Sequence, residues 1–436
     1  MNILKFGGTS VGSAERMKEV AQLVTNGNKN IVVLSAMSGT TNTLVEIAGY
    51  LYKKNDEGAI EQIFKLEEKY HKTVNELYKT EEFKQKGHDL IQSHFNYIKS
   101  FTQDMFTIYE EKAVLAQGEL ISTALFHFLL QEQGVNSCLI PALNFMRIDK
   151  ENEPDNFYIK ENLKREIDNH NSCKVFITQG FICRNSYGEI DNLKRGGSDY
   201  TASLVGVGVN ADEIQIWTDI DGMHNNDPRF VENTYPLSHI SFDEAAELAY
   251  FGAKILHPSS ILPAKLANIP VRLKNTMQPE AEGTLVSSRT GTEGIKAIAA
   301  KDNITAVKIK SGRMLLAYGF MRKVFEIFEM YKTPIDMITT SEVAVSLTID
   351  ETQNLAEITE ELKKFGTVEI DNDLSIICIA GNFIAESKGH ALKIFDALQN
   401  IPIRMISYGG SKHNVSVLVN TSDKVEALRS LNEKLF

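Results

Sequence analysis

A glycine turn that carries a lysine and two hydroxyls lies almost at the start of the chain. Residues 5–11 read Lys-Phe-Gly-Gly-Thr-Ser-Val, between an apolar run at Ile3-Leu4 and a helix-like segment from Ser13 to Thr25. A strand, a glycine turn and a helix in this order can bind phosphate, because glycines let backbone N–H groups approach the oxygens and the helix N-terminus adds partial positive charge. A lysine at the strand end supplies a point charge for a polyphosphate. The pattern predicts a nucleotide site rather than an ordinary turn.

Two better-known phosphate-binding patterns are absent. A Walker A loop needs Gly-Lys followed by Ser or Thr, and the chain has no Gly-Lys pair. Protein kinases need His-Arg-Asp and Asp-Phe-Gly, which are also missing. A dinucleotide-like pattern, GxGxxA, occurs at residues 206–211, but that fingerprint must follow a strand and open a helix. Here we expect a helix at about 198–205 before it and a strand at 213–218 after it, so we predict no nucleotide binding there.

Four further segments could complete a site for phosphoryl transfer. They are Gln117-Gly118-Glu119, where a carboxylate opens or interrupts a helix; Lys194 to Asp199, a second glycine turn into a helix; Trp217 to Gly222, running on to Arg229 after a strand; and Phe251 to Pro258, with a lysine at a helix end. Phosphoryl transfer depends mostly on positioning and on neutralisation of charge by Lys, Arg and Mg²⁺. Each segment alone is typical of a loop, but together they favour this chemistry.

The elements that must position these residues alternate along the first part of the chain. Apolar runs at Ile31–Leu34, Leu139-Ile140 and Val175–Thr178 are separated by helical stretches. This alternation predicts an α/β fold, with a parallel-rich central sheet and helices on both faces. Residues 42–133 are expected to be mostly helical, and the charged stretch from Lys53 to Lys86 is expected to form a solvated helical hairpin.

The last third of the chain contains an internal repeat. Pro334-Ile335-Asp336-Met337-Ile338 recurs as Pro402-Ile403-Arg404-Met405-Ile406, and an alternating strand follows each copy. The repeat predicts two ferredoxin-like units. The second copy ends one strand short, and the strand at about 295–300 could complete it. We therefore predict that the first unit (about 304–373) is inserted within the second (about 295–300 plus 374–436).

Size and composition are typical of a globular protein with several domains. The chain has 436 residues, of which 43% are hydrophobic and 24% are charged, and its formal net charge is −11. This charge argues against a broad nucleic-acid surface. We find no run of about 18 apolar residues that would span a membrane, and the strand at the start leaves no room for a signal peptide. Cys138, Cys173, Cys183 and Cys378 show no CxxC spacing, so we expect reduced thiols, no zinc site and a cytoplasmic location.

The motifs together resemble those of the aspartokinases, in the amino-acid kinase family. The markers are Lys-Phe-Gly-Gly-Thr-Ser-Val (5–11), Arg-Gly-Gly-Ser-Asp (195–199), Trp-Thr-Asp (217–219), Phe-Gly-Ala-Lys-Ile-Leu-His-Pro (251–258) and Lys-Asn-Thr (274–276). The resemblance extends over nearly the whole chain. Within the aspartokinases, the chain most resembles the monofunctional, lysine-sensitive group. The segments that carry this resemblance are Gly319-Phe320, Asp336–Val343 and Ile403–Gly409. It implies an amino-acid kinase domain at 1–290 and a tandem of ACT units at 295–436.

The resemblance also implies an activity. An aspartate kinase transfers the γ-phosphoryl group of ATP to the β-carboxylate of L-aspartate, which gives 4-phospho-L-aspartate for lysine, threonine and methionine biosynthesis. Its cofactors would be ATP and Mg²⁺, with Mg²⁺ held mainly by the ATP phosphates and not by protein ligands. L-lysine would inhibit at the ACT region. We expect a homodimer or a dimer of dimers through the ACT units, because small sheets with open edges readily pair, and no nucleic-acid or membrane partner.

Roles follow from the resemblance position by position. The catalytic residues would be Lys5, Asp199 and Lys254. Aspartate would contact Ser35, Thr41, Glu119, Arg195 and Ser198. The nucleotide would contact Lys5, Gly7, Gly8, Ser10, Thr218, Asp219, His224, Arg229 and Lys254. Lysine would contact Met314, Ala317, Gly319, Phe320, Met321, Asp336, Ser341 and Glu342. A β-carboxylate with a pKa near ~3.9 is already ionised and needs no general base, so Asp199 is expected to orient Lys5.

Three positions depart from the family pattern. Lys194 stands where relatives have a glycine, and would strain the turn if that position needs a positive φ. His224 replaces an aromatic residue that often borders the nucleotide. Ala317 replaces a serine that often faces the effector, and the loss of one hydrogen bond costs roughly 0.5–1.5 kcal/mol. We therefore expect lysine to inhibit, but weakly.

Three other interpretations were weighed. Another amino-acid kinase, acting on glutamate, acetylglutamate or a nucleotide, would share the glycine turns but usually lacks the tandem regulatory repeat. An amino-acid sensor on an inactive kinase scaffold is suggested only by Lys194. A fused homoserine dehydrogenase is not expected, since the chain ends at Phe436 after the second regulatory copy.

Overall fold

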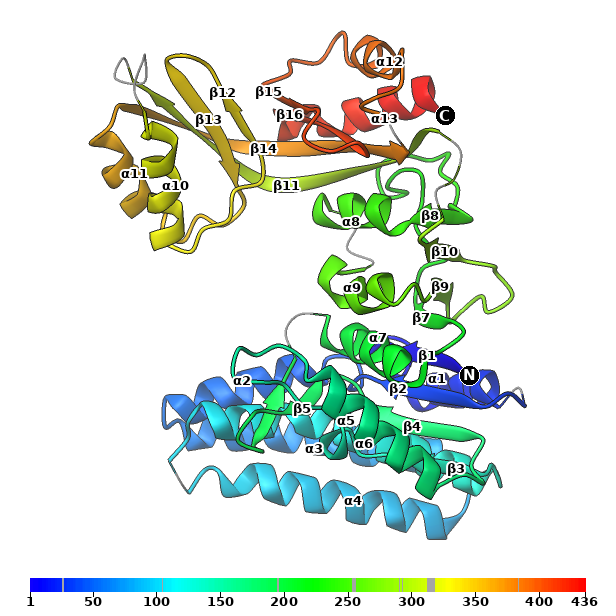
Figure 1. The fold of residues 1–436 in the computed structure, drawn as a ribbon. Helices are drawn as coiled ribbons and strands as arrows, with labels where there is room; N and C mark the ends of the chain where they lie inside the picture. The colour runs from blue at the N-terminus through cyan, green and yellow to red at the C-terminus, as the bar shows by residue number, and fades with distance from the viewer. Residues whose placement is uncertain are drawn as a thin grey trace. The chain divides into compact units, whose positions relative to one another are not determined.

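The computed structural model forms two compact units, and each is described by itself (Figure 1). The first unit comprises Met1–Gly222 and Leu256–Ser288, and the second comprises Met223–Ile255 and Arg289–Phe436. The second unit thus includes residues 223–255, which lie before the domain boundary predicted at about residue 290. The residues that the structure describes are 1–25, 27–103, 105–193, 196–252, 256–289, 291, 293–311, 318–382 and 384–436.

A parallel-rich sheet forms the centre of the first unit, as predicted. Its strands are β1 (Asn2–Phe6), β2 (Asn30–Leu34), β3 (Ser137–Leu139), β4 (Val175–Gln179), β7 (Ile214–Thr218), β9 (Val271–Asn275) and β10 (Thr284–Ser287). Within this unit they lie in the order β3-β4-β2-β1-β7-β9-β10. All neighbouring pairs from β3 to β9 are parallel, and β10 is antiparallel to β9. β2 and β4 are buried along their whole length, and their apolar residues are consecutive rather than alternating, as is typical of strands covered on both faces.

Helices and a short hairpin complete the first unit. They are α1 (Ala14–Val24), α2 (Thr40–Tyr52), α3 (Asp56–Leu77), α4 (Glu81–Ser100), α5 (Ile108–Glu132), a 3₁₀ turn (Ala142–Asn144), α6 (Asn156–Asn169), β5 (Ile182–Arg184), β6 (Ile190–Asn192), α7 (Gly197–Val209) and α9 (Pro258–Leu266). The predicted order of a helix and then a strand around residues 206–211 is confirmed, since α7 precedes β7. A Cβ on Gly206 would lie 2.6 Å from Cδ1 of Ile214, so this glycine allows close packing of helix on strand.

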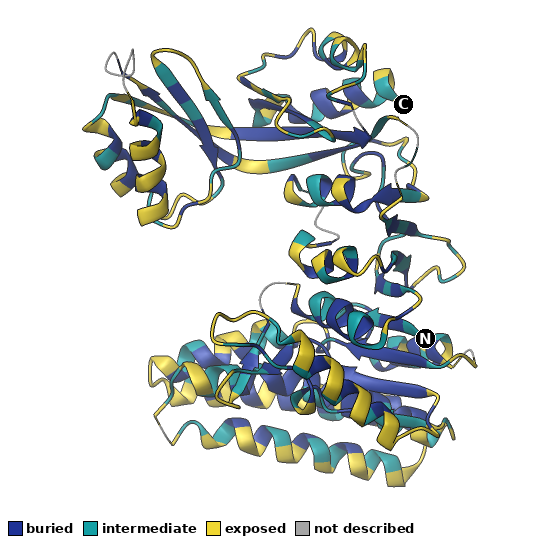
Figure 2. Cartoon of the chain, viewed as in Figure 1, coloured by how far each residue is buried: buried dark blue, intermediate teal, exposed yellow. Residues whose placement is uncertain are grey.

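The charged hairpin of α3 and α4 is less solvated than predicted. Both helices exist, but Ile63, Tyr70 and Val74 are fully buried and belong to the main core of the first unit. Figure 2 shows the outward faces of α3 and α4 in yellow and their inner faces in dark blue. The expectation of a solvated hairpin is therefore wrong for the inner face. The apolar residues recur at helical spacing between the charges, and this spacing produces a buried stripe.

The long helix α5 is a core element. By length and composition it could cross a membrane, but 78% of the relevant window is buried inside the protein. Gly118 was expected to open or interrupt a helix, and this expectation is wrong, because α5 continues through it. A Cβ on Gly118 would lie 2.8 Å from Cβ of Ala36, so the glycine lets α5 approach the turn after β2.

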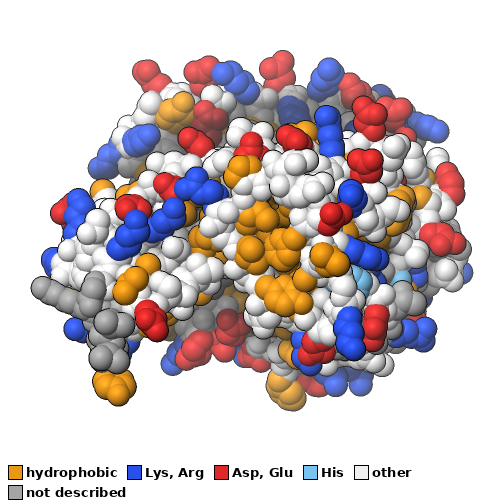
Figure 3. Space-filling view, turned by 90° about the horizontal axis from the view of Figure 1, so that it is seen from above, with side chains coloured by type: hydrophobic (Ala, Val, Ile, Leu, Met, Phe, Trp, Pro, Cys, Tyr) orange, Lys and Arg blue, Asp and Glu red, His pale blue; other side chains and the backbone are white. Residues whose placement is uncertain are grey.

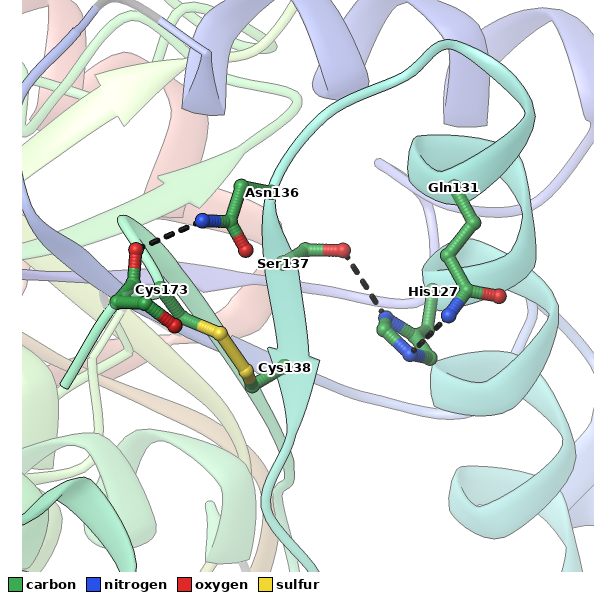
Figure 4. Close-up of a disulfide and its surroundings, with 7 residues drawn as sticks. His127, Gln131, Asn136, Ser137, Cys138 and Cys173 are labelled. Carbon is green, nitrogen blue, oxygen red and sulfur yellow. Dashed lines mark hydrogen bonds between the residues drawn. A yellow bond between two sulfur atoms is a disulfide. The ribbon is translucent and has the colours of Figure 1, made fainter. Parts of the chain in front are cut away.

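Cys138 and Cys173 form a disulfide, which corrects the expectation of four reduced thiols (Figure 4). Their Cα atoms are 6.1 Å apart, although 35 positions separate them in sequence. Parallel pairing of β3 with β4 brings them together, and sequence spacing does not reveal such pairing. Beside the bridge, Ser137 Oγ lies 3.0 Å from Nδ1 of His127 on α5. Cys183 and Cys378 are free and buried.

A curved antiparallel sheet organises the second unit. The elements of this unit are β8 (His239–Ser241), α8 (Phe242–Tyr250), β11 (Gly294–Lys310), α10 (Phe320–Met330), β12 (Ile338–Thr340), β13 (Ala344–Ile349), α11 (Leu355–Lys363), β14 (Thr367–Asn382), α12 (His390–Ala397), β15 (Met405–Tyr408), β16 (Asn414–Asn420), a 3₁₀ turn (Thr421–Asp423) and α13 (Lys424–Leu435). The sheet order is β12-β13-β11-β14-β16-β15. The long strands β11 and β14 pair along nearly their full length and run through two hydrophobic cores, one with α10 and α11, the other with α12 and α13.

Candidate active site

A pocket of about 440 Å³ lies in the first unit, where the carboxyl ends of the parallel strands meet the glycine turns. In open α/β sheets this edge is the usual place for a ligand. Of the residues predicted to act in the site, the pocket lining includes Lys5, Gly8, Ser35, Thr41, Glu119, Ser198 and Asp199. The structure therefore brings together side chains from the two ends of a stretch of almost 200 residues.

Lys5 and Asp199 form an ion pair in this pocket. The Nζ–Oδ1 distance is 2.7 Å, and the two side chains are only 12% and 14% exposed. Lys5 ends β1, and Asp199 lies in the first turn of α7, where a carboxylate is favoured by the helix dipole. A Cβ on Gly8 would lie 2.9 Å from the carbonyl oxygen of Ala36, so the first glycine turn packs tightly against the turn after β2. The pair holds an ammonium in a fixed position beside the pocket.

Hydroxyl groups from Ser35, Thr41 and Ser198 also line the pocket. Ser35 Oγ donates to Ser198 Oγ at 2.9 Å, and Ser122 Oγ donates to the carbonyl of Ser35 at 2.8 Å. A Cβ on Gly180 would lie 2.5 Å from Ser198 Oγ, so a larger residue there would displace this hydroxyl. Thr41 lies in the first turn of α2. These groups can donate to carboxylate or phosphoryl oxygens.

Glu119 is a buried carboxylate with room for a cation. Its residue is 3% exposed, and the backbone N–H of Ala36 donates to Oε1 at 3.2 Å. Oε2 is buried and has no hydrogen-bond partner among the residues that the structure describes. Burial raises the pKa of Glu119 to about 7. A buried oxygen without a donor costs about 1–3 kcal/mol or more, and a ligand ammonium would remove that cost.

The residues predicted to contact the nucleotide separate into two groups. In the first unit, Thr218 ends β7 and Asp219 follows it, and Thr218 Oγ1 donates to Asp219 Oδ1 at 3.1 Å. Ser10 is buried and lies 2.7 Å, Oγ to Oγ1, from Thr276, so it links two strand ends and does not line the pocket. No role was predicted for Thr276, although this residue belongs to the Lys-Asn-Thr marker at 274–276.

The other predicted nucleotide residues lie in the second unit. His224 Nδ1 is 3.0 Å from Oγ1 of Thr234. Arg229 forms a two-pronged ion pair with Asp227, with Nη2–Oδ2 at 2.6 Å, and its side chain is 76% exposed. This pairing two residues away was not anticipated.

Asp336, one of the effector residues predicted from the resemblance, belongs to a buried ion pair. Asp336 Oδ1 lies 2.7 Å from Nζ of Lys301 and accepts from the Tyr250 hydroxyl at 3.1 Å. Lys301 also pairs with Asp350 at 2.8 Å. The Asp336 side chain is 1% exposed, and burial raises its pKa. Sequence reasoning found Asp336 but missed Lys301 and Tyr250, which lie 35 and 86 positions away.

The remaining predicted effector residues have mixed environments. Gly319 has a φ of 82° and caps α10, a conformation that favours glycine. Phe320 and Met321 pack in the core beneath α10. The Ser341 backbone N–H donates to the carbonyl of Ala344 at 2.8 Å, and Glu342 is exposed. Five positions discussed above lie outside the described residues: Lys194, Arg195, Lys254, Met314 and Ala317.

Both the first part and the last part of the chain match known protein families. Residues 1–275 match the amino acid kinase family, and residues 377–435 match an ACT domain. The fold and the pocket therefore define an amino acid kinase that carries a regulatory region.

Individual relatives give the finer assignment. The chain is 33% identical to lysine-sensitive aspartokinase 3 of Escherichia coli, over 100% of this chain and 99% of that protein. It superposes on E. coli aspartokinase III in complex with aspartate and ADP (TM-score 0.84, 32% identity, all of both chains). For the same enzyme with lysine and aspartate, the TM-score is 0.83 at 32% identity, covering 100% of this chain and 99% of that one. The chain belongs to the aspartokinases of the amino acid kinase family.

Proposed function

We propose that this protein is an ATP-dependent aspartate kinase, and that L-lysine inhibits it through the ACT region. The observation that carries the proposal is the buried Glu119 carboxylate, whose Oε2 lacks a described partner, in the same pocket as the Lys5–Asp199 pair. An amino-acid substrate brings an ammonium for the first group and an acceptor carboxylate toward the second. The complexes of the E. coli relative with aspartate and ADP, and with lysine, support the same assignment.

The reaction requires two anions to meet. The β-carboxylate of aspartate is ionised at neutral pH and attacks without a general base. Lys5, oriented by Asp199, neutralises charge on the transferring phosphoryl group, and Lys254 acts on the ATP phosphates. Mg²⁺ would supply further positive charge while bound mainly to ATP. No group of three or more His, Cys, Asp or Glu side chains in the described part of the chain could hold a metal.

Substrate recognition divides among groups of different charge. Glu119 binds the ammonium of aspartate, and Arg195 binds its α-carboxylate as a planar fork. The hydroxyls of Ser35, Thr41 and Ser198 bind the remaining oxygens. On the nucleotide side, the proposed residues are Gly7, Gly8, Ser10, Thr218, Asp219, His224 and Arg229.

The regulatory assignment rests on the repeat and on the lysine complex of the relative. The residues proposed to bind lysine are Met314, Ala317, Gly319, Phe320, Met321, Asp336, Ser341 and Glu342. We assign residues 1–290 to catalysis and residues 295–436 to regulation, with the first ACT unit inserted within the second. Long β11 and β14 support the insertion, because α10, β12, β13 and α11 all lie between them in the chain.

Self-association through the ACT region is part of the proposal. The short strand β15 exposes Ile406 and Tyr408. Figure 3 shows one face on which hydrophobic side chains gather, with charged side chains around them. Light scattering should give a mass of at least twice 48.8 kDa. A monomer with and without lysine would contradict this part.

We propose a cytoplasmic location, because the reaction consumes ATP, and no nucleic-acid or membrane partner. The structure contains one disulfide, Cys138–Cys173, and counting the free thiols tests whether the protein contains it. Thiol titration of denatured protein, prepared without reductant, should find two free cysteines.

A single assay tests the kinase and the sensor together. Purified protein with ATP, Mg²⁺ and L-aspartate should yield an acyl phosphate that hydroxylamine traps as a hydroxamate, and L-lysine should reduce the yield. L-glutamate in place of aspartate should give little product. If product forms but lysine does not reduce it, the kinase assignment would stand and the assignment of lysine as the effector would be wrong. The absence of product from folded protein would favour an inactive sensing scaffold.

A further inference from the structure

The turn between β2 and α2 forms one wall of the active-site pocket. Residues 36–39 and Thr41 line the pocket, and Gly39 has a φ of 81°, so the turn depends on a left-handed glycine. Its first residue is held by α5, through the bond from the Ala36 N–H to Glu119. What holds its other end is the charged helix α3, which sequence reasoning had left without a role.

Two consecutive residues of α3 contact this turn. Lys69 Nζ donates to the carbonyl oxygen of Ser38 at 2.7 Å, and it would lie 3.9 Å from a Cβ on Gly39. The buried Tyr70 hydroxyl lies 3.0 Å from Oγ1 of Thr40. Tyr70 is fully buried, and burial raises its pKa, whereas Lys69 is an exposed residue whose pKa is lowered by the partial burial of its ammonium against the turn.

We propose that Lys69 is a positioning residue for the aspartate side of the pocket. It does not line the pocket itself, and it acts by holding the Ser38 carbonyl. The turn that it holds connects Ser35 to Thr41, both proposed to contact aspartate. Loss of the Lys69 contact lets the turn move, so aspartate binding weakens more than ATP binding. This inference rests on the proposed kinase function for its kinetic consequence, but not for its structural one.

The experiment compares Lys69→Met with Lys69→Arg, which keeps a cationic donor, and with Lys65→Met as a matched control. Lys65 lies one turn earlier on α3 and, among the described residues, forms its ion pair with Glu61, at 2.6 Å on the surface. Hydrogen–deuterium exchange of the peptide spanning residues 36–41 should be faster in K69M. The reporting amide is that of Thr40, which donates to the Met37 carbonyl at 3.0 Å. K69R and K65M should exchange as the wild type does.

Kinetics give the second readout. In K69M the KM for aspartate should rise about tenfold, with kcat, the KM for ATP and the melting temperature nearly unchanged, and K69R should restore it. Unchanged exchange in K69M would overturn the proposal, even if KM rose through loss of charge alone. Equal losses in both KM values, kcat and melting temperature would also overturn it, because they indicate a general packing defect. Wild-type protein without kinase activity would refute the proposed function, while exchange would still decide whether Lys69 holds the turn.

Discussion

Two buried carboxylates, Glu119 in the pocket and Asp336 in the regulatory sheet, differ in what neutralises them. Burial raises the pKa of both. Asp336 has partners within the chain, Lys301 and the Tyr250 hydroxyl. Glu119 has one backbone donor and no described cation. If the proposed sites are right, a substrate ammonium at Glu119 meets a carboxylate that pairs with no described cation, whereas an effector ammonium at Asp336 meets a carboxylate that already pairs with Lys301.

The largest effect should come from removing the charge of Glu119. Glu119→Gln keeps the size and the bond to the Ala36 N–H, but it leaves a substrate ammonium unpaired. Breaking a buried pair costs about 3–5 kcal/mol, so the KM for aspartate should rise about 100-fold or more, with a much smaller change for ATP. Initial-rate kinetics measure this. Glu111→Gln, near the start of the same helix, should behave as the wild type, and an unchanged KM in E119Q would break the comparison.

The pH dependence of the KM for aspartate should sharpen the comparison between the two carboxylates. With its pKa raised to about 7, Glu119 is protonated below that pH and loses the charge that binds ammonium. The KM for aspartate should then rise about tenfold per pH unit below 7, and E119Q should lack this slope. The stability effect has the opposite direction. A carboxyl with a raised folded pKa destabilises the fold as pH rises from its ordinary pKa of 4.5 to about 7, so melting temperature should fall over that window in the wild type relative to E119Q.

A smaller effect is expected at the regulatory pair. If Lys301 competes with the effector for Asp336, Lys301→Met should let lysine inhibit at about fivefold lower concentration, corresponding to ~1 kcal/mol. Lys308→Met is the matched control, since Lys308 lies on the same strand and pairs with Asp371 at 2.7 Å. The measurement is the lysine concentration for half inhibition of each variant at a fixed aspartate concentration. Loss of inhibition in K301M would mean that Lys301 positions Asp336 instead of competing.

The smallest effect should follow Tyr250→Phe, which removes one hydrogen bond to Asp336. Burial, together with Asp336, raises the pKa of the Tyr250 phenol to about 12, so it remains a donor at all working pH values. One such bond contributes about 0.5 kcal/mol at the low end of the usual range, which predicts a roughly twofold shift in the lysine concentration for half inhibition. Tyr408→Phe, whose hydroxyl bonds the Ala385 carbonyl, should leave it unchanged.

Much of the fold and part of the site could be predicted from local sequence. The strand, glycine turn and helix at residues 2–24 were predicted, because their period, cap and glycines act over a few positions. The pocket position of Lys5 and Asp199 was anticipated through the family motifs. The prediction that Gly118 opens or interrupts a helix was wrong, because this glycine instead allows close packing against Ala36, which follows strand β2.

The sequence by itself determined which residues are available and in what local order: the two glycine-rich segments, the charged residues within them and the repeated regulatory copy. The tertiary structure decided what depends on distant neighbours. Desolvation of Glu119, burial of one face of α3, the Cys138–Cys173 bridge and the pairing of Lys301 with Asp336 all arise between segments far apart in the chain. Pairing and loss of solvent are properties of the packed surroundings, so no local pattern specifies them.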